Sequence, residues 1–273
     1  MEKNFTKKSF GERLKSMLRV DARRMFISHF FYIMAGISFA VPILILVMTT
    51  MMEGTVTVDP QTGLPGEPME GFDYVWQILG ALSGVSSDQT TAAMGMDLVS
   101  MCNINMMFFA VAVLVCLFSS EDFRSGYAKN LFTVRAKKTD YVISKTVICF
   151  IGATCMFIAF FIGTVIGGGV AGLPFTMDGF NMGNIVCCIL SKIFLLPVFV
   201  SIFTLMSVIA KQKSWLSICL SLGVGMLLFM MIPMLTPLNA TIVHVLGCLL
   251  GGALFGVGLG AISNVVLKKT ALV

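Results

Sequence analysis

Long apolar runs alternate with short polar segments along this chain of 273 residues. A transmembrane helix needs about 20 predominantly apolar residues, and six segments meet that requirement. They cover roughly residues 27–50, 98–118, 146–170, 185–210, 215–235 and 241–267. The pattern therefore predicts an all-α integral membrane protein with six transmembrane helices.

The composition supports the same fold class. Hydrophobic residues make up 57% of the chain and charged residues 12%, whereas an ordinary soluble domain has about 25% charged residues. A water-soluble globule is therefore excluded. The eight cysteines all lie within the apolar runs, so we expect them to pack as small hydrophobes rather than to form disulfides or a zinc site.

Lys and Arg are concentrated on one side of the predicted bundle. Residues 1–26 hold eight of them and residues 119–145 hold six, whereas residues 51–97 hold seven acids and no Lys or Arg. Because cytoplasmic flanks are enriched in basic residues, we expect both termini to be cytoplasmic, with 51–97 as an extracellular segment of a multi-pass protein in the cell membrane. The net charge of +5 then reflects topology and contact with membrane lipid, and no nucleic-acid partner is expected.

The first 26 residues form a cytoplasmic amphipathic segment ahead of the six-span domain, which covers 27–273. Ser9 and Glu12 have the spacing of a capping box, and apolar residues then recur on one helical face. Asp21 interrupts this apolar face. We predict an interfacial helix over 9–25 that leads into the first span.

The extracellular segment contains a second amphipathic pattern. Phe72, Val75, Trp76, Leu79 and Leu82 follow helical spacing. This pattern predicts a short helix lying on the outer leaflet, with its aromatic residues at the depth of the lipid headgroups. A lid over a substrate is the alternative interpretation.

The connection over residues 119–145 is long for a link between two antiparallel spans. Phe123, Tyr127, Leu131 and Val134 recur on one helical face, which predicts an amphipathic cytoplasmic helix. The pattern alone leaves open whether this helix lies on lipid or in a groove of another protein.

The same connection resembles a known family. Residues Glu121 to Leu131 read Glu-Asp-Phe-Arg-Ser-Gly-Tyr-Ala-Lys-Asn-Leu, followed by Arg-Ala-Lys-Lys at 135–138 and by Tyr-Val-Ile-Ser-Lys at 141–145. This run is similar to the loop after span two in type 2 permeases of ABC (ATP-binding cassette) exporters, where a Glu, a Gly, a Lys and Leu, a basic turn and a final Lys recur. Tyr127 stands where the family usually has Thr, and the basic turn lacks a frequent Pro.

The plan of this chain, with six spans, an N-terminal amphipathic helix and both termini inside, also resembles that family. Its compactness resembles the bacterial members. The resemblance implies a permease homodimer or heterodimer served by cytoplasmic ATP-binding subunits. ATP and Mg²⁺ would be bound on that partner, and this chain would hold no cofactor. The coupling helix would transmit the movement of the partner to the membrane. The residues that the resemblance implicates are Glu121, Gly126 and Lys129 for coupling, and Phe123, Tyr127 and Leu131 as the docking face.

Few polar groups lie inside the predicted spans. Lys192 is the only strongly charged residue well within one, and it is expected to extend to the outer interface, with a substrate or lipid contact as the alternative. Asn103 and Asn105 need hydrogen-bonding partners, which another helix or a polar translocation path would provide. Glycines at small-xxx-small spacing predict close helix packing in spans three and six. They are Gly163, Gly167, Gly247, Gly251, Gly252, Gly256 and Gly260.

No motif for catalysis, metal binding or ATP binding is found in the sequence. The predicted function is therefore that of a permease subunit, without enzymatic activity of its own, that exports an amphipathic peptide, drug or lipid-like substrate. The alternative is a membrane immunity or interaction protein that binds a peptide or lipid without pumping it. An ion-coupled carrier is disfavoured because acids inside the spans are nearly absent.

Overall fold

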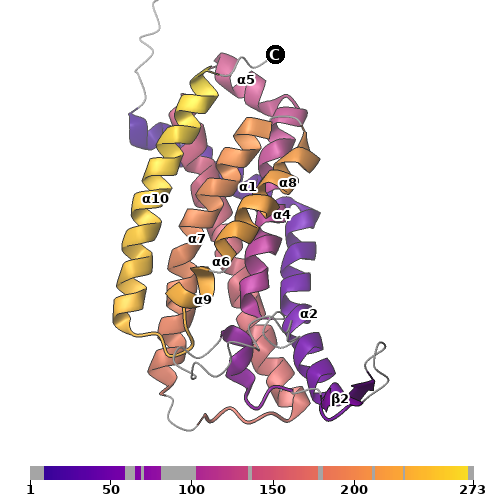
Figure 1. Cartoon of the computed structure of the whole chain (residues 1–273). Coiled ribbons are helices and arrows are strands. Elements are labelled where there is room, and N and C mark those ends of the chain that lie inside the picture. Colours follow the sequence, from indigo (N-terminus) through magenta and orange to yellow (C-terminus); the bar gives the residue numbers. More distant parts are fainter. Residues whose placement is uncertain are drawn as a thin grey trace, which may run out of the picture.

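The computed structural model describes residues 9–58, 65–68, 71–80, 103–134, 137–177, 181–210, 213–229 and 231–269. Long helices run side by side and form a bundle (Figure 1). The helices are α1 (Phe10–Ile27), α2 (His29–Met52), η1 (Val75–Leu79), η4 (Ile104–Met106), α4 (Met107–Arg124), α5 (Tyr127–Val134), α6 (Lys138–Ala171), α7 (Met182–Ala210), α8 (Ser214–Phe229), α9 (Met231–Leu235) and α10 (Ile242–Lys269). The all-α membrane fold expected from the sequence is consistent with this architecture.

Within the described residues, five helices are long and apolar enough to cross a membrane. They are α2, α6, α7, α10 and the continuous helical segment Ile104–Arg124. The predicted span over 215–235 contains α8, which has 16 residues, and the five-residue α9, and the residue between them lies outside the described residues. A helix of 16 residues is about 24 Å long, which is shorter than a hydrocarbon core of about 30 Å. The structure thus accounts for five of the six predicted spans.

The two ends of the bundle differ in structure. The basic end, as we call it, carries α1, α5 and the C-terminal end of α10, whereas the hairpin end carries an antiparallel pair of strands, β1 (Val56–Val58) and β2 (Pro65–Pro68) (Figure 1). At the basic end, the Nζ of Lys138 donates a hydrogen bond to the carbonyl oxygen of Leu267 at 2.8 Å. This bond ties the start of α6 to the end of α10.

The predicted N-terminal helix is confirmed. The backbone N–H of Ser9 donates to the Glu12 carboxylate at 3.3 Å, as the capping-box spacing indicated. Met17, Asp21 and Met25 recur every four residues and are buried, because this face of α1 packs against α6. Asp21, which interrupts the apolar pattern in the sequence, therefore lies on the buried face of α1.

Close packing between helices depends on three of the glycines. Gly163 and Gly167 lie where α6 crosses α2, and a Cβ atom at Gly163 would collide with the carbonyl oxygen of Phe39. Gly252 of α10 lies against α7, where a Cβ atom would collide with the carbonyl oxygen of Phe194. The other glycines of the predicted packing stripe are less constrained. A Cβ at Gly256 would make ordinary contacts, and one at Gly247, Gly251 or Gly260 would meet open space.

The amphipathic helix expected on the outer leaflet is instead inserted into the bundle. In η1, Val75, Trp76, Ile78 and Leu79 are all buried. The indole N–H of Trp76 donates to the carbonyl oxygen of Phe175 at 2.7 Å, and its ring stacks on Phe161 with a centroid distance of 6.0 Å. The prediction of a surface location was wrong because the apolar face found a protein partner between the helices. Leu82 lies outside the described residues.

Candidate functional site

The segment that resembles the exporter motif lies at the basic end of the bundle. Its first part continues α4 to Arg124, and its middle part is α5. Gly126 separates the two helices with φ of +73°, a left-handed conformation that glycine adopts without steric cost. The single amphipathic helix predicted from the apolar stripe is therefore two helices with a glycine turn between them. Arg135 of the basic turn lies outside the described residues.

The apolar stripe of this segment faces the chain's own bundle. Phe123 is buried with Tyr141, at a centroid distance of 6.2 Å, in a small apolar cluster that also contains Met17 and Leu267. Leu131 packs against the same cluster and is partly buried. The predicted docking residue Phe123 is thus used within the chain. Glu121 and Lys129, the charged residues predicted for coupling, are exposed.

Four charged side chains from three helices meet directly beneath this segment, and we call them the ion cluster: Asp21, Arg24, Asp122 and Lys145. The Asp122 carboxylate lies 2.6 Å from Nη1 of Arg24 through one oxygen and 2.6 Å from Nζ of Lys145 through the other. Asp21 lies 3.4 Å from Nζ of Lys145. Asp21, Asp122 and Lys145 have no exposed side-chain surface.

Hydroxyl groups complete the ion cluster. Tyr141 donates a hydrogen bond to Asp122 at 2.9 Å, and Ser144 donates to Asp21 at 2.5 Å. Buried charges are costly unless they are paired and hydrogen-bonded. In the cluster each charge has an opposite charge nearby and each carboxylate accepts one hydroxyl hydrogen bond, and these contacts tie α1, α4 and α6 together.

Tyr127 connects α5 to the ion cluster. Its ring lies under the Arg24 guanidinium, with Cζ 4.1 Å from the ring centroid, an arrangement that favours a cation–π interaction. Burial lowers the pKa of Arg24, but the Asp122 carboxylate outweighs this effect and raises the pKa above its ordinary value. Burial, together with Asp21, raises the pKa of Tyr127. Arg24 therefore stays charged and Tyr127 neutral at physiological pH.

Sequence reasoning missed the ion cluster because it assigned Arg24 and Lys145 to membrane topology. One signal was available, since an acid at Asp21 within the apolar face of an amphipathic helix requires a buried partner. The identity of that partner depends on how the helices pack, because Lys145 lies more than 100 residues further along the chain.

The two asparagines predicted for a translocation path lie nearer the hairpin end. Asn103 caps η4 by accepting a hydrogen bond from the Asn105 backbone N–H at 2.9 Å. The side-chain oxygen of Asn105 accepts from Nζ of Lys192 at 2.8 Å, and Lys192 also donates to the hydroxyl and carbonyl oxygens of Thr236 at 2.8 and 3.3 Å. Lys192 is 0% exposed. The expectation that it extends to the interface was therefore wrong, because it finds acceptors inside the protein.

In the described part of the chain, no three His, Cys, Asp or Glu side chains lie close enough to hold a metal ion. Comparisons with protein-family models, with curated proteins and with solved structures found no match to this chain. The functional argument therefore rests on the motif segment and its geometry.

Proposed function

We propose that this chain is the membrane permease subunit of an ABC exporter of type 2, with six spans and cytoplasmic termini. α8 and α9 together would form the remaining span. ATP and Mg²⁺ are bound by a separate cytoplasmic subunit, and the permease acts as a homodimer or heterodimer. Its substrate is an amphipathic peptide, drug or lipid-like molecule, in keeping with an apolar interior that has few charged groups.

One observation carries this proposal. Asp122 and Lys145, from the two ends of the motif segment, meet in an ion pair of 2.6 Å. This pair closes α4, α5 and the start of α6 into one unit, and Arg24 joins α1 to it. A unit braced in this way moves as a rigid body, as mechanical coupling to a partner requires. A push on α5 would reach the long helices α4 and α6 directly.

The exposed charges of this unit are the proposed contact with the ATP-binding subunit. Glu121 and Lys129 face outward, whereas Phe123 is buried. We therefore assign partner contact to the polar face of α5 and the end of α4. Phe123, Tyr127 and Leu131 instead position that face by packing against the rest of the chain.

The test is affinity purification from native membranes in mild detergent, with mass spectrometry for a stoichiometric ATP-binding protein. We expect this partner to be lost from the Glu121→Lys and Lys129→Glu variants and to be retained by Lys15→Glu, an exposed substitution on α1. Size-exclusion profiles establish that each variant is folded. Recovery of folded wild-type protein without such a partner would instead favour the non-pumping immunity or interaction protein.

A further inference from the structure

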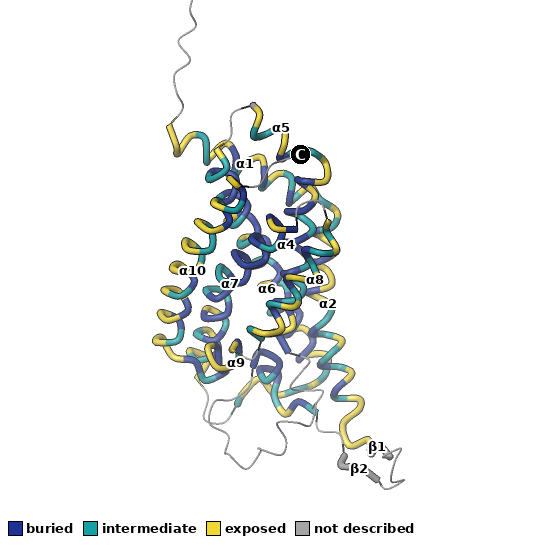
Figure 2. Tube along the Cα trace, turned by 45° about the horizontal axis from the view of Figure 1, so that its top comes forward, coloured by how far each residue is buried: buried dark blue, intermediate teal, exposed yellow. Residues whose placement is uncertain are grey.

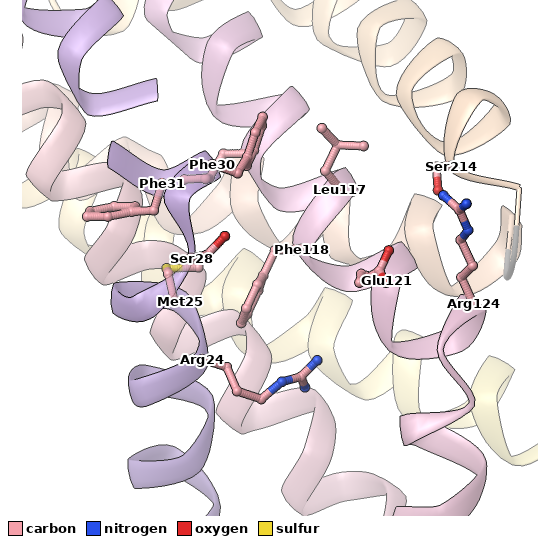
Figure 3. Close-up of a pocket in the computed structure, with 11 residues that line it drawn as sticks. Arg24, Met25, Ser28, Phe30, Phe31, Leu117, Phe118, Glu121, Arg124 and Ser214 are labelled. Atoms are coloured by element: carbon pink, nitrogen blue, oxygen red, sulfur yellow. The ribbon is translucent and has the colours of Figure 1, made fainter. Parts of the chain in front are cut away.

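A pocket of about 330 Å³ lies at the basic end between α1, α2, α4 and the start of α8 (Figure 3). Its walls are apolar on one side, where Phe30, Phe31 and Leu114 line it. Its charged part is formed by Glu121 and Arg124, in the last turn of α4. The pocket is therefore amphipathic, and its lining does not include Lys129 or the other residues of α5.

The apolar and charged parts of the pocket follow each other along the bundle axis. Leu114, Leu117, Glu121 and Arg124 lie in this order on α4, over about 15 Å of helix. On the facing side, the pocket includes Ser28, at the junction where α1 ends and the apolar helix α2 begins. The charged rim thus lies at the boundary of the apolar spans, where lipid headgroups meet a membrane protein.

The charge of the rim determines which headgroup fits. Arg24 also lines the pocket, but its charge is compensated within the ion cluster, where two acids meet two bases. Glu121 and Arg124 remain, and among the described residues neither side chain has an ion-pair partner. Figure 3 shows these two side chains extending from α4 at separate points of the rim. An acid and a base at two points of the rim are complementary to a ligand that carries one cation and one anion.

The surroundings of the pocket favour a lipid over a compact solute. A volume near 330 Å³ lies at the lower end of the range for ligand pockets, about 300–1,000 Å³. It holds a headgroup with the start of an acyl chain, and the remainder of the lipid would extend into the bilayer. Trp215, next to the pocket residue Ser214, is 65% exposed, as is typical of aromatic residues at membrane interfaces.

We propose that this pocket binds a zwitterionic aminophospholipid with a phosphoethanolamine headgroup. The primary ammonium donates hydrogen bonds to the Glu121 carboxylate, and the phosphate accepts them from the Arg124 guanidinium. An acyl chain lies along Leu117 and the phenylalanines of α2. Lipid binding requires neither ATP nor the partner subunit, but the site shares Glu121 with the proposed partner contact. Lys129→Glu separates the two proposals, because Lys129 does not line the pocket, and this variant should lose the partner and keep the lipid preference.

Native mass spectrometry of the full chain in detergent tests the proposal, with dioleoyl phosphatidylethanolamine, phosphatidylglycerol and phosphatidylcholine added separately. The readout is the fraction of protein that retains each lipid. We expect phosphatidylethanolamine to be retained about fivefold more than the other two, the upper end for a partly exposed charge contact. Equal retention of all three lipids, or a preference for phosphatidylglycerol, would overturn the proposal.

Single substitutions separate the two charge contacts. Glu121→Gln is expected to remove the preference for phosphatidylethanolamine over phosphatidylglycerol, whereas Arg124→Gln lowers the retention of both. Leu117→Trp fills the apolar part of the pocket and lowers the retention of all three lipids. Because the preference is a ratio within one variant, it does not depend on the folded fraction.

The matched controls are Glu53→Gln and Arg19→Gln, which alter exposed charges away from the pocket. Both controls are expected to keep the wild-type preference. A preference that persists in Glu121→Gln, or that is lost equally in Glu53→Gln, would show that the lipid binds elsewhere.

Discussion

Single buried charges determine how the basic end is held together. Asp122 contacts Arg24, Lys145 and Tyr141 at once, which makes it the central residue of the ion cluster. By contrast, Arg13 and Asp140 form an ion pair at 3.1 Å in which the Arg13 side chain is 27% exposed. Loss of the Asp122 carboxylate leaves the buried Lys145 ammonium short of a counter-charge, whereas loss of the Asp140 carboxylate leaves Arg13, which water reaches. The two sites should therefore respond very differently to neutralisation.

We expect Asp122→Asn to lower the free energy of unfolding by about 3–5 kcal/mol, because two buried or partly buried cations lose their counter-charge. Asp140→Asn is the matched control and should cost about 1 kcal/mol or less, because the Arg13 side chain that it leaves is 27% exposed and stays hydrated. Unfolding in mixed micelles, followed by circular dichroism, measures both. Similar values for the two variants would show that the ion cluster does not brace the basic end.

Lys192 is also a buried charge, but within the described residues its hydrogen-bond acceptors are neutral oxygens. Asn105→Leu removes one of these acceptors and should cost about 1.5–3 kcal/mol, as expected for a hydrogen bond to a charged group. In a Lys192→Met background the same substitution should cost at least about 1 kcal/mol less, because the cation that it served is gone. Additive effects in this double-mutant cycle of unfolding free energies would contradict the contact.

At the scale of elements, helix contacts depend on where glycines face. Neighbouring glycines of α10 differ completely, since a Cβ at Gly252 would collide with the Phe194 carbonyl oxygen whereas one at Gly251 would meet open space. Of these two glycines, only Gly252 lies in the contact with α7. The glycine stripe of α10 therefore has one packing face and one outward face, and Figure 2 shows the outer side of this helix exposed along most of its length.

The pair Gly252→Ala and Gly251→Ala tests this difference with one methyl group each. Gly252→Ala should lower the free energy of unfolding by about 1–3 kcal/mol, because α10 must move away from α7. Gly251→Ala should cause no loss, since alanine is the better helix former by up to about 1 kcal/mol. Unfolding in mixed micelles measures the difference. Equal effects would mean that α10 does not pack on α7 through this face.

At the scale of the whole molecule, the bundle separates a basic end from a hairpin end. α1, α5 and the C-terminal end of α10 lie at the former, and β1 and β2 lie at the latter (Figure 1). This separation gives physical form to the charge asymmetry of the sequence. Because basic flanks stay in the cytoplasm, we expect the hairpin end to face outward.

Cysteine labelling in intact cells tests this orientation. A membrane-impermeant maleimide should label Glu53→Cys at the hairpin end and should leave Asn130→Cys on α5 unlabelled until the membrane is permeabilised. Both positions are exposed, so accessibility reports the side of the membrane rather than burial. The unsubstituted chain serves as the background for its native cysteines. Labelling of Asn130→Cys in intact cells would reverse the proposed topology.

Hydropathy alone predicted most of the helices, because an apolar run long enough to cross a bilayer has few alternatives in any packing. The capping box at Ser9 likewise depends only on neighbouring residues. The predicted span over 215–235 stays a prediction, because α8 ends at Phe229, α9 begins at Met231 and the residue between them lies outside the described residues.

Tertiary structure decided what the polar and amphipathic positions do. Asp21 interrupted an apolar face in sequence, yet it pairs with a lysine of α6 in the fold. Trp76 had the pattern of a surface helix but is buried between helices, and Lys192 found Asn105 and Thr236 rather than water. A periodicity shows that a face must be covered or that a charge needs a partner. Which group fulfils that need depends on segments that are distant in the chain and that meet only when the helices pack.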